Sequence, residues 1–238
     1  MTLACPALIA DVAPGMCKAV DIYCERTTDA LWAEPLNAIS NVAFLIAALA
    51  IWRLRAAHPN ASSDTWVRAL SAIIFVVGLG SFAFHTIATR WAEWADVIPI
   101  LVFMLAYCWL FLTLYFGWHW AAKSATVALF FGATFMLEAE NFDWLLWGGA
   151  MYVPSIALLL GLGGFVRRSH PAAGRAFFIA TAVFLVSFAA RTLDMPVCPS
   201  LPIGTHYFWH ICNATVLYLL VRIIVLHPPE EAESRASA

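Results

Sequence analysis

The sequence has little charge and no concentration of one sign. Only 12% of its 238 residues are Asp, Glu, Lys or Arg, about half the share of a soluble domain. The net charge of -2 and the lack of a basic run argue against a nucleic-acid partner. The amino end also lacks the basic stretch and unbroken apolar core of a signal peptide, because Pro6 and Asp11 interrupt it.

What the chain has in excess is apolar surface. Hydrophobic residues make up 63% of it, and its mean hydropathy of +0.80 indicates that much of this surface faces lipid. Charge-free runs lie at 35–52, 69–89, 97–122, 124–137, 144–166, 176–190 and 195–221. A spanning helix needs about 20 apolar residues, so the fourth and sixth runs cross a bilayer only if Glu138 and Arg191 lie at membrane depth or at the interface.

These runs predict an all-α, polytopic membrane protein built as a seven-transmembrane-helix bundle. We expect residues 1–34 to form an extracytoplasmic amino-terminal segment and residues 35–227 to form the bundle. Residues 228–238 are polar and begin with proline, which is typical of a disordered tail.

The basic residues predict the orientation. With the amino terminus outside, the inner segments hold nine of them: Arg53, Arg55, Arg68, Lys123, Arg167, Arg168, Arg175, Arg222 and Arg235. The outer segments hold four: Lys18, Arg26, Arg90 and Arg191. Since short inner loops are enriched in Lys and Arg, we expect the amino terminus outside and the carboxyl terminus in the cytoplasm.

This topology brings five polar residues to one membrane depth. The second predicted helix runs outward and ends with Ser81 and His85, and the third begins outside, close to Asp96. The seventh also begins outside, with His206 and His210 in its early turns. We therefore expect these five side chains to converge at the outer end of the bundle.

The spacing of the histidines favours a metal site. His206 and His210 are four residues apart and share a helix face. Together with His85 they offer three imidazoles, which leave the fourth position of a tetrahedral zinc open for water, as in catalytic sites. A single histidine in an apolar helix is more often a hydrogen-bonded bundle residue, so the prediction depends on the whole set.

Two further residues fit catalytic roles. The motif HExxH is absent because Tyr207 follows His206, and Asp96 is the natural replacement for the general base of that motif. Ser81 is placed to orient the water or to donate a hydrogen bond to a developing oxyanion.

The pattern SFAFH (81–85), Asp96 and HYFWH (206–210) resembles the alkaline ceramidase family. That family is part of a wider group of seven-helix membrane hydrolases that includes the adiponectin receptors. The segment at 21–41, with its Cys-Glu pair and its E-P-x-N-x-x-S-N run, resembles the ceramidases specifically. The resemblance implies zinc-dependent hydrolysis of ceramide to a sphingoid base and a fatty acid. It assigns zinc to His85, His206 and His210, and catalysis to Asp96 and Ser81.

The resemblance also implies a calcium site that braces the zinc region, with Asp21, Glu25 and Glu34 as its ligands. The family pattern is imperfect here, because Tyr23 replaces a tryptophan and Thr27 stands in place of an asparagine. Without the resemblance, the charged residues of this segment are expected to form a solvated loop: Glu25, Arg26, Asp29 and Glu34.

The six cysteines divide by position. Cys108 and Cys212 lie inside predicted spans, where they are expected to be small core residues, and the other four lie on the predicted outer side. The family ties its amino segment to the loop before the last helix, which implies a disulfide between Cys24 and Cys198. Cys5 and Cys17 are the remaining pair, and the sequence leaves open whether they are bonded.

Several functions compete. The chain is expected to act on a lipid within the bilayer, with no obligatory protein partner, in the inner membrane of a bacterium or the endoplasmic reticulum or Golgi of a eukaryote. One alternative is a hydrolase of another lipid amide or ester. A second is a receptor similar to the adiponectin receptors, which place the amino end and the zinc inside. A transporter is disfavoured because the polar cluster lies at one end only.

Overall fold

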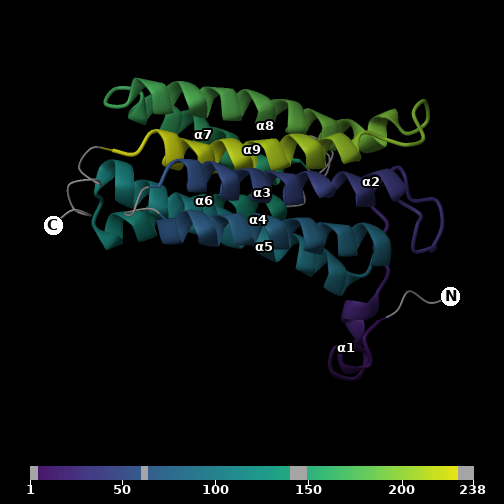
Figure 1. The fold of residues 1–238 in the computed structure, drawn as a ribbon. Coiled ribbons are helices and arrows are strands. Elements are labelled where there is room, and N and C mark those ends of the chain that lie inside the picture. Colours follow the sequence, from purple (N-terminus) through teal and green to yellow (C-terminus); the bar gives the residue numbers. More distant parts are fainter. Residues whose placement is uncertain (1–4, 60–63, 140–148, 230–238) are drawn as a thin grey trace.

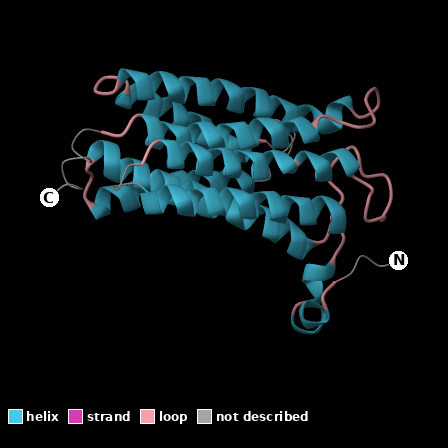
Figure 2. Ribbon diagram, in the orientation of Figure 1, coloured by secondary structure: helices cyan, strands magenta, loops and turns pink. Residues whose placement is uncertain are grey.

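The computed structural model describes residues 5–59, 64–139 and 149–229. Within these ranges the regular secondary structure is helical, and the only bridge between extended residues pairs Ala19 with Thr89 (Figure 2). The elements preceding the bundle are α1 (Ala7–Val12) and η1 (Pro14–Cys17). The bundle consists of α2 (Pro35–Ser40), α3 (Val42–Ala57), α4 (Asp64–Ile87), α5 (Arg90–Phe116), α6 (Trp120–Ala139), η3 (Ala150–Tyr152), α7 (Val153–Val166), α8 (Pro171–Val197) and α9 (His206–Leu226).

Six helical segments of the described residues are long and apolar enough to cross a membrane. They are α2 together with α3, then α4, α5, α6, α8 and α9. The fifth predicted run, 144–166, is represented by a shorter apolar helix at Ala150–Val166. Its predicted beginning at residue 144 lies outside the described residues, as does most of the predicted tail. The chain is thus an all-α, multi-pass membrane protein.

The helices differ in their limits from the charge-free runs, and the fourth and sixth include Glu138 and Arg191. Gly117, at a φ of 59°, ends α5, so the fourth long helix begins at Trp120 and reaches 20 residues. Helix α8, which corresponds to the sixth run, continues through Arg191 and Asp194 to Val197, and residues 198–205 form a loop before α9. Charge did not mark the end of α8, because Asp194 near that end is buried inside the fold.

The helices pack around α9. It contacts α3 and α8 extensively and also contacts α4, and 67% of its most apolar window is buried. By contrast, only 17% of the corresponding window of α6 is buried, so α6 lies at the periphery. The shared core includes Phe44, Leu70, Phe111, Phe177 and Ile224, each at most 2% exposed. Because this apolar core joins most of the helices, it fixes how far each helix is shifted along its axis relative to its neighbours.

The amino-terminal segment, the α4–α5 turn and the α8–α9 loop lie at one end of the bundle, and the carboxyl end of α9 lies at the other (Figure 1). The Val20 N–H donates to the Ala88 carbonyl at 2.9 Å, and the Arg90 N–H donates to the Lys18 carbonyl at 2.9 Å. A disulfide between Cys24 and Cys198 ties the same segment to the α8–α9 loop.

A second disulfide closes the amino-terminal turn between Cys5 and Cys17, the pair that the sequence left open. Cys108 and Cys212 are free and buried, as expected of core residues. Which side of the membrane the amino-terminal end faces stays a prediction from the basic residues, and so does the division at residues 34 and 227.

Candidate metal centre

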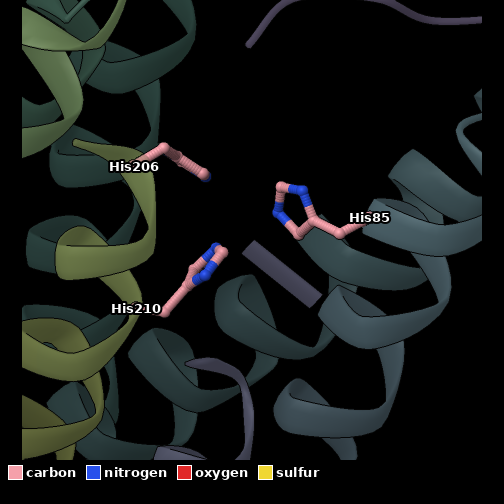
Figure 3. Close-up of side chains that lie close together, drawn as sticks. All are labelled: His85, His206 and His210. Atoms are coloured by element: carbon pink, nitrogen blue, oxygen red, sulfur yellow. The ribbon is translucent and has the colours of Figure 1, made fainter. Parts of the chain in front are cut away.

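Three histidines meet at this end of the bundle. His85 comes from the last turn of α4, and His206 and His210 come from the first turns of α9 (Figure 3). One ring nitrogen of each lies within 4.8 Å of the other two. All three are at most 2% exposed. The predicted convergence of these three histidines is confirmed.

Two buried ring nitrogens of the cluster are unsatisfied within the described part of the chain. His85 Nε2 and His206 Nδ1 have no hydrogen-bond partner among the described residues. Buried polar atoms in native structures are nearly always satisfied, so each of these two requires a partner beyond the described residues. A metal ion that binds imidazole would satisfy both, and three imidazoles at this separation fit zinc.

The outward nitrogens of two rings are held by the segment around α2. His85 Nδ1 lies 2.6 Å from Glu34 Oε2, and His210 Nδ1 lies 2.7 Å from Ser40 Oγ. The Ser40 hydroxyl donates its single proton to the Asn37 carbonyl at 2.8 Å, so it accepts from His210. Both rings therefore carry their proton on Nδ1 and present Nε2 as a lone pair, the arrangement that second-shell partners impose on metal ligands. Sequence reasoning missed Ser40, although it lies in the run that carried the family resemblance.

Asp96 and Ser81 lie beside this cluster. Asp96, in the second turn of α5, is half-buried and lies within electrostatic range of His85 and within reach of the Ser81 side chain. Gly80 makes this possible, since a Cβ there would lie 2.0 Å from the Ala95 carbonyl oxygen. The backbones of α4 and α5 thus touch one residue away from each of the two predicted catalytic side chains.

The predicted calcium site is not supported. Glu34 Oε1 accepts from Arg26 Nε at 2.5 Å, and its Oε2 accepts from both His85 and the Asn37 side chain. Burial raises the pKa of Glu34, but these hydrogen bonds outweigh it and hold the pKa below its ordinary value. Its oxygens are therefore occupied by donors, and a buried guanidinium supplies the neighbouring positive charge. The solvated-loop alternative also fails for Arg26 and Glu34, which are 6% and 3% exposed.

The other two predicted calcium ligands have different surroundings. Asp21 is exposed. The Glu25 carboxylate accepts the backbone N–H groups of Leu36 at 2.8 Å and Asn37 at 2.9 Å, so it satisfies donors at the start of α2. Burial raises the pKa of Glu25, and those two N–H groups oppose the rise. Recognition by residue type found the carboxylates but not their partners.

Two more residues that sequence reasoning did not assign hold the start of α9. Asp194, 2% exposed, accepts the N–H groups of Thr205 at 2.7 Å and His206 at 2.9 Å through Oδ1, and that of Cys24 at 2.9 Å through Oδ2. The Tyr23 ring stacks on His206 with 3.6 Å between centroids. Burial raises the pKa of the Tyr23 hydroxyl well above its ordinary value, so the ring packs as a neutral phenol.

The fold and the site together define a multi-pass helical membrane protein with a buried three-histidine centre that fits zinc. The sequence model of the family described as Ceramidase matches residues 20–236, and the chain belongs to that family. Membership implies a hydrolase of the amidase type whose substrate is a lipid. None of the curated proteins compared with the chain matches it.

Proposed function

We propose that the protein hydrolyses the amide bond of ceramide and releases a sphingoid base and a fatty acid. The observation that carries the proposal is the cluster of His85, His206 and His210 in a chain of the ceramidase family. Two buried ring nitrogens of the cluster have no partner among the described residues, and a zinc ion would satisfy both. Asp96 and Ser81 at its edge add the proton-transfer groups that amide hydrolysis requires.

The three histidines would hold zinc, which supplies a Lewis acid that polarises the carbonyl and makes water acidic near neutral pH. Asp96 takes the proton from the attacking water as the new C–O bond forms. It then delivers that proton to the amine nitrogen as the C–N bond breaks. Ser81, beside Asp96, orients the water or donates a hydrogen bond to the developing oxyanion.

The placement of the site suits a lipid. It lies at one end of the bundle, where the amide and head group of a lipid reach the interface while its chains stay in the bilayer. The excess of basic residues in the opposite loops supports an extracytoplasmic site, with the amino terminus outside. The inner membrane of a bacterium, or the endoplasmic reticulum or Golgi of a eukaryote, would hold such a protein.

The test uses detergent-purified protein, its zinc content and its release of fatty acid from ceramide. We expect about one zinc per chain, lost together with activity in His210→Ala. His58→Ala is the matched control, because His58 is exposed and bonds only its own helix among the described residues. Asp96→Asn should keep its zinc and lose roughly 10²- to 10⁴-fold in kcat.

Three outcomes would change the proposal. Full activity in zinc-free protein would overturn the proposed chemistry. A zinc-loaded protein that leaves ceramide intact would point instead to another lipid amide or ester, or to a receptor similar to the adiponectin receptors. Equal kcat in Asp96→Asn and the wild type would remove Asp96 from its role.

A further inference from the structure

Arg26 is a buried cation that contacts the metal centre from the amino-terminal segment. Its side chain is 3% exposed in the ion pair with Glu34, and its Nε donates to Glu34 Oε1 at 2.5 Å. Its Nη2 donates to the backbone carbonyl of His85 at 3.2 Å. One guanidinium thus touches both the main chain of His85 and the carboxylate that accepts from its ring.

We propose that Arg26 is a positioning residue that fixes His85 for metal binding and that does, within the chain, the work of a bound cation. The proposal rests on the zinc centre proposed above. It explains why Glu34, which was expected to bind calcium, is paired with a protein cation instead.

The first part of the argument concerns Glu34. Its Oε2 accepts from His85 Nδ1 at 2.6 Å, which keeps the proton on Nδ1 and turns Nε2 toward the other histidines. A carboxylate that is 3% exposed needs a fixed partner for its other oxygen. Arg26 is that partner, so removing its guanidinium frees Glu34 to turn away from the ring.

The second part concerns the end of α4. The His85 carbonyl lies in the last turn of α4 (Asp64–Ile87), where the final four carbonyls lack a partner within the helix. Arg26 donates to this carbonyl and places its positive charge at the negative end of the helix dipole. The backbone that carries the histidine is therefore held by the same group as the ring.

The shape of the side chain matters as well as its charge. Nη1 of Arg26 lies 3.3 Å from the Thr28 carbonyl and 3.4 Å from the Ala30 carbonyl, which closes the loop around the guanidinium. These contacts point in several directions from one planar group. A lysine ammonium is a single point of charge and reaches only part of them, so Arg26→Lys should restore function incompletely.

The experiment measures metal binding without substrate, in purified protein stripped of metal. In Arg26→Ala we expect a 10- to 100-fold weaker zinc affinity, the usual effect of losing an outer-shell partner. We also expect a shift of the visible absorption bands of the cobalt(II)-loaded protein. Arg26→Lys should fall between Arg26→Ala and the wild type. Arg90→Ala is the control, since Arg90 is a half-exposed arginine at the same end that pairs with Glu93.

Three further results test the proposal, the first of them the pathway through Glu34. Because Arg26 also holds the His85 carbonyl, Arg26→Ala combined with Glu34→Gln should weaken zinc binding by less than the sum of the two single losses; fully additive losses would overturn the pathway through Glu34. If Arg26→Ala does not fold, Arg26→Lys serves alone. Wild-type zinc affinity in the lysine variant would contradict the role of the several donors of the planar guanidinium. Millimolar calcium should change neither the zinc affinity nor the melting temperature of the wild type.

The two proposals fail in different ways. A wild-type protein that binds no zinc would refute the proposed function. A wild type that binds zinc, with Arg26→Ala and Arg26→Lys equal to it in affinity and cobalt spectrum, would refute the positioning role alone.

Discussion

Gly80 controls how closely α4 and α5 approach each other beside the metal centre. A Cβ at this position would lie 2.0 Å from the Ala95 carbonyl oxygen and 3.3 Å from the Asp96 amide nitrogen. The atom in the way belongs to the backbone, so no side-chain rotation removes the clash. In Gly80→Ala the two helices must separate by roughly 1.4 Å, the difference between 2.0 Å and the 3.4 Å of an ordinary contact.

Packing decides which helix moves. α4 is held by α2, α3 and α9 as well as by α5, whereas α5 contacts mainly α4, α6 and η1. We therefore expect α5 to shift and to carry Asp96 away from Ser81 and His85. A misplacement of about 1 Å in a catalytic group costs on the order of 10²-fold in rate. Overpacking adds about 1–3 kcal/mol of destabilisation.

The assay for Gly80→Ala combines kcat for release of fatty acid, bound zinc and the melting temperature in detergent. We expect kcat to fall about 100-fold while zinc content stays near that of the wild type, because the three histidines lie on α4 and α9. Gly161→Ala is the matched control, since a Cβ at Gly161 meets no described atom within 4 Å. A Gly80→Ala protein with wild-type kcat would refute the view that this contact positions Asp96.

Two further predictions concern the elements that hold the amino-terminal end together. Asp194→Ala leaves the buried N–H groups of Thr205, His206 and Cys24 without their acceptor, so we expect thermal unfolding to show a loss of about 3 kcal/mol or more; an unchanged melting temperature would contradict this. Replacing Cys24 and Cys198 together with serine opens a link between residues 174 positions apart and should cost about 2–5 kcal/mol. Reductant should then lower the wild-type melting temperature toward that of the variant, and no response to reductant would count against the prediction.

The limits of helices in this chain were harder to predict than their existence. The charge-free runs located the apolar segments, but the sixth run ends at residue 190, before Arg191, because charged residues usually leave the membrane. The structure continues that helix to Val197 and satisfies Asp194 with backbone donors from a distant loop. Local composition carries no information about such partners, so the ends of α8 and α9 were misplaced.

The metal centre itself could be predicted from sequence because its geometry is largely local. His206 and His210 share a face at any height of a helix, and topology alone brings His85 and Asp96 to the same end. The second layer is different. Ser40 and His210 are 170 residues apart, and their contact depends on how α2 packs against α9.

The amino-terminal segment shows the same division between sequence and tertiary structure. The sequence by itself determined that carboxylates would stand near the histidines, since Glu25 and Glu34 precede the first span and the topology returns the other helices to that end. Only the tertiary structure decided what those carboxylates bind. Arg26 turns inward and is buried against Glu34 and the end of α4, because a buried carboxylate and unpaired helix carbonyls both require a donor. Which cation meets that requirement depends on three-dimensional contacts that no sequence pattern records.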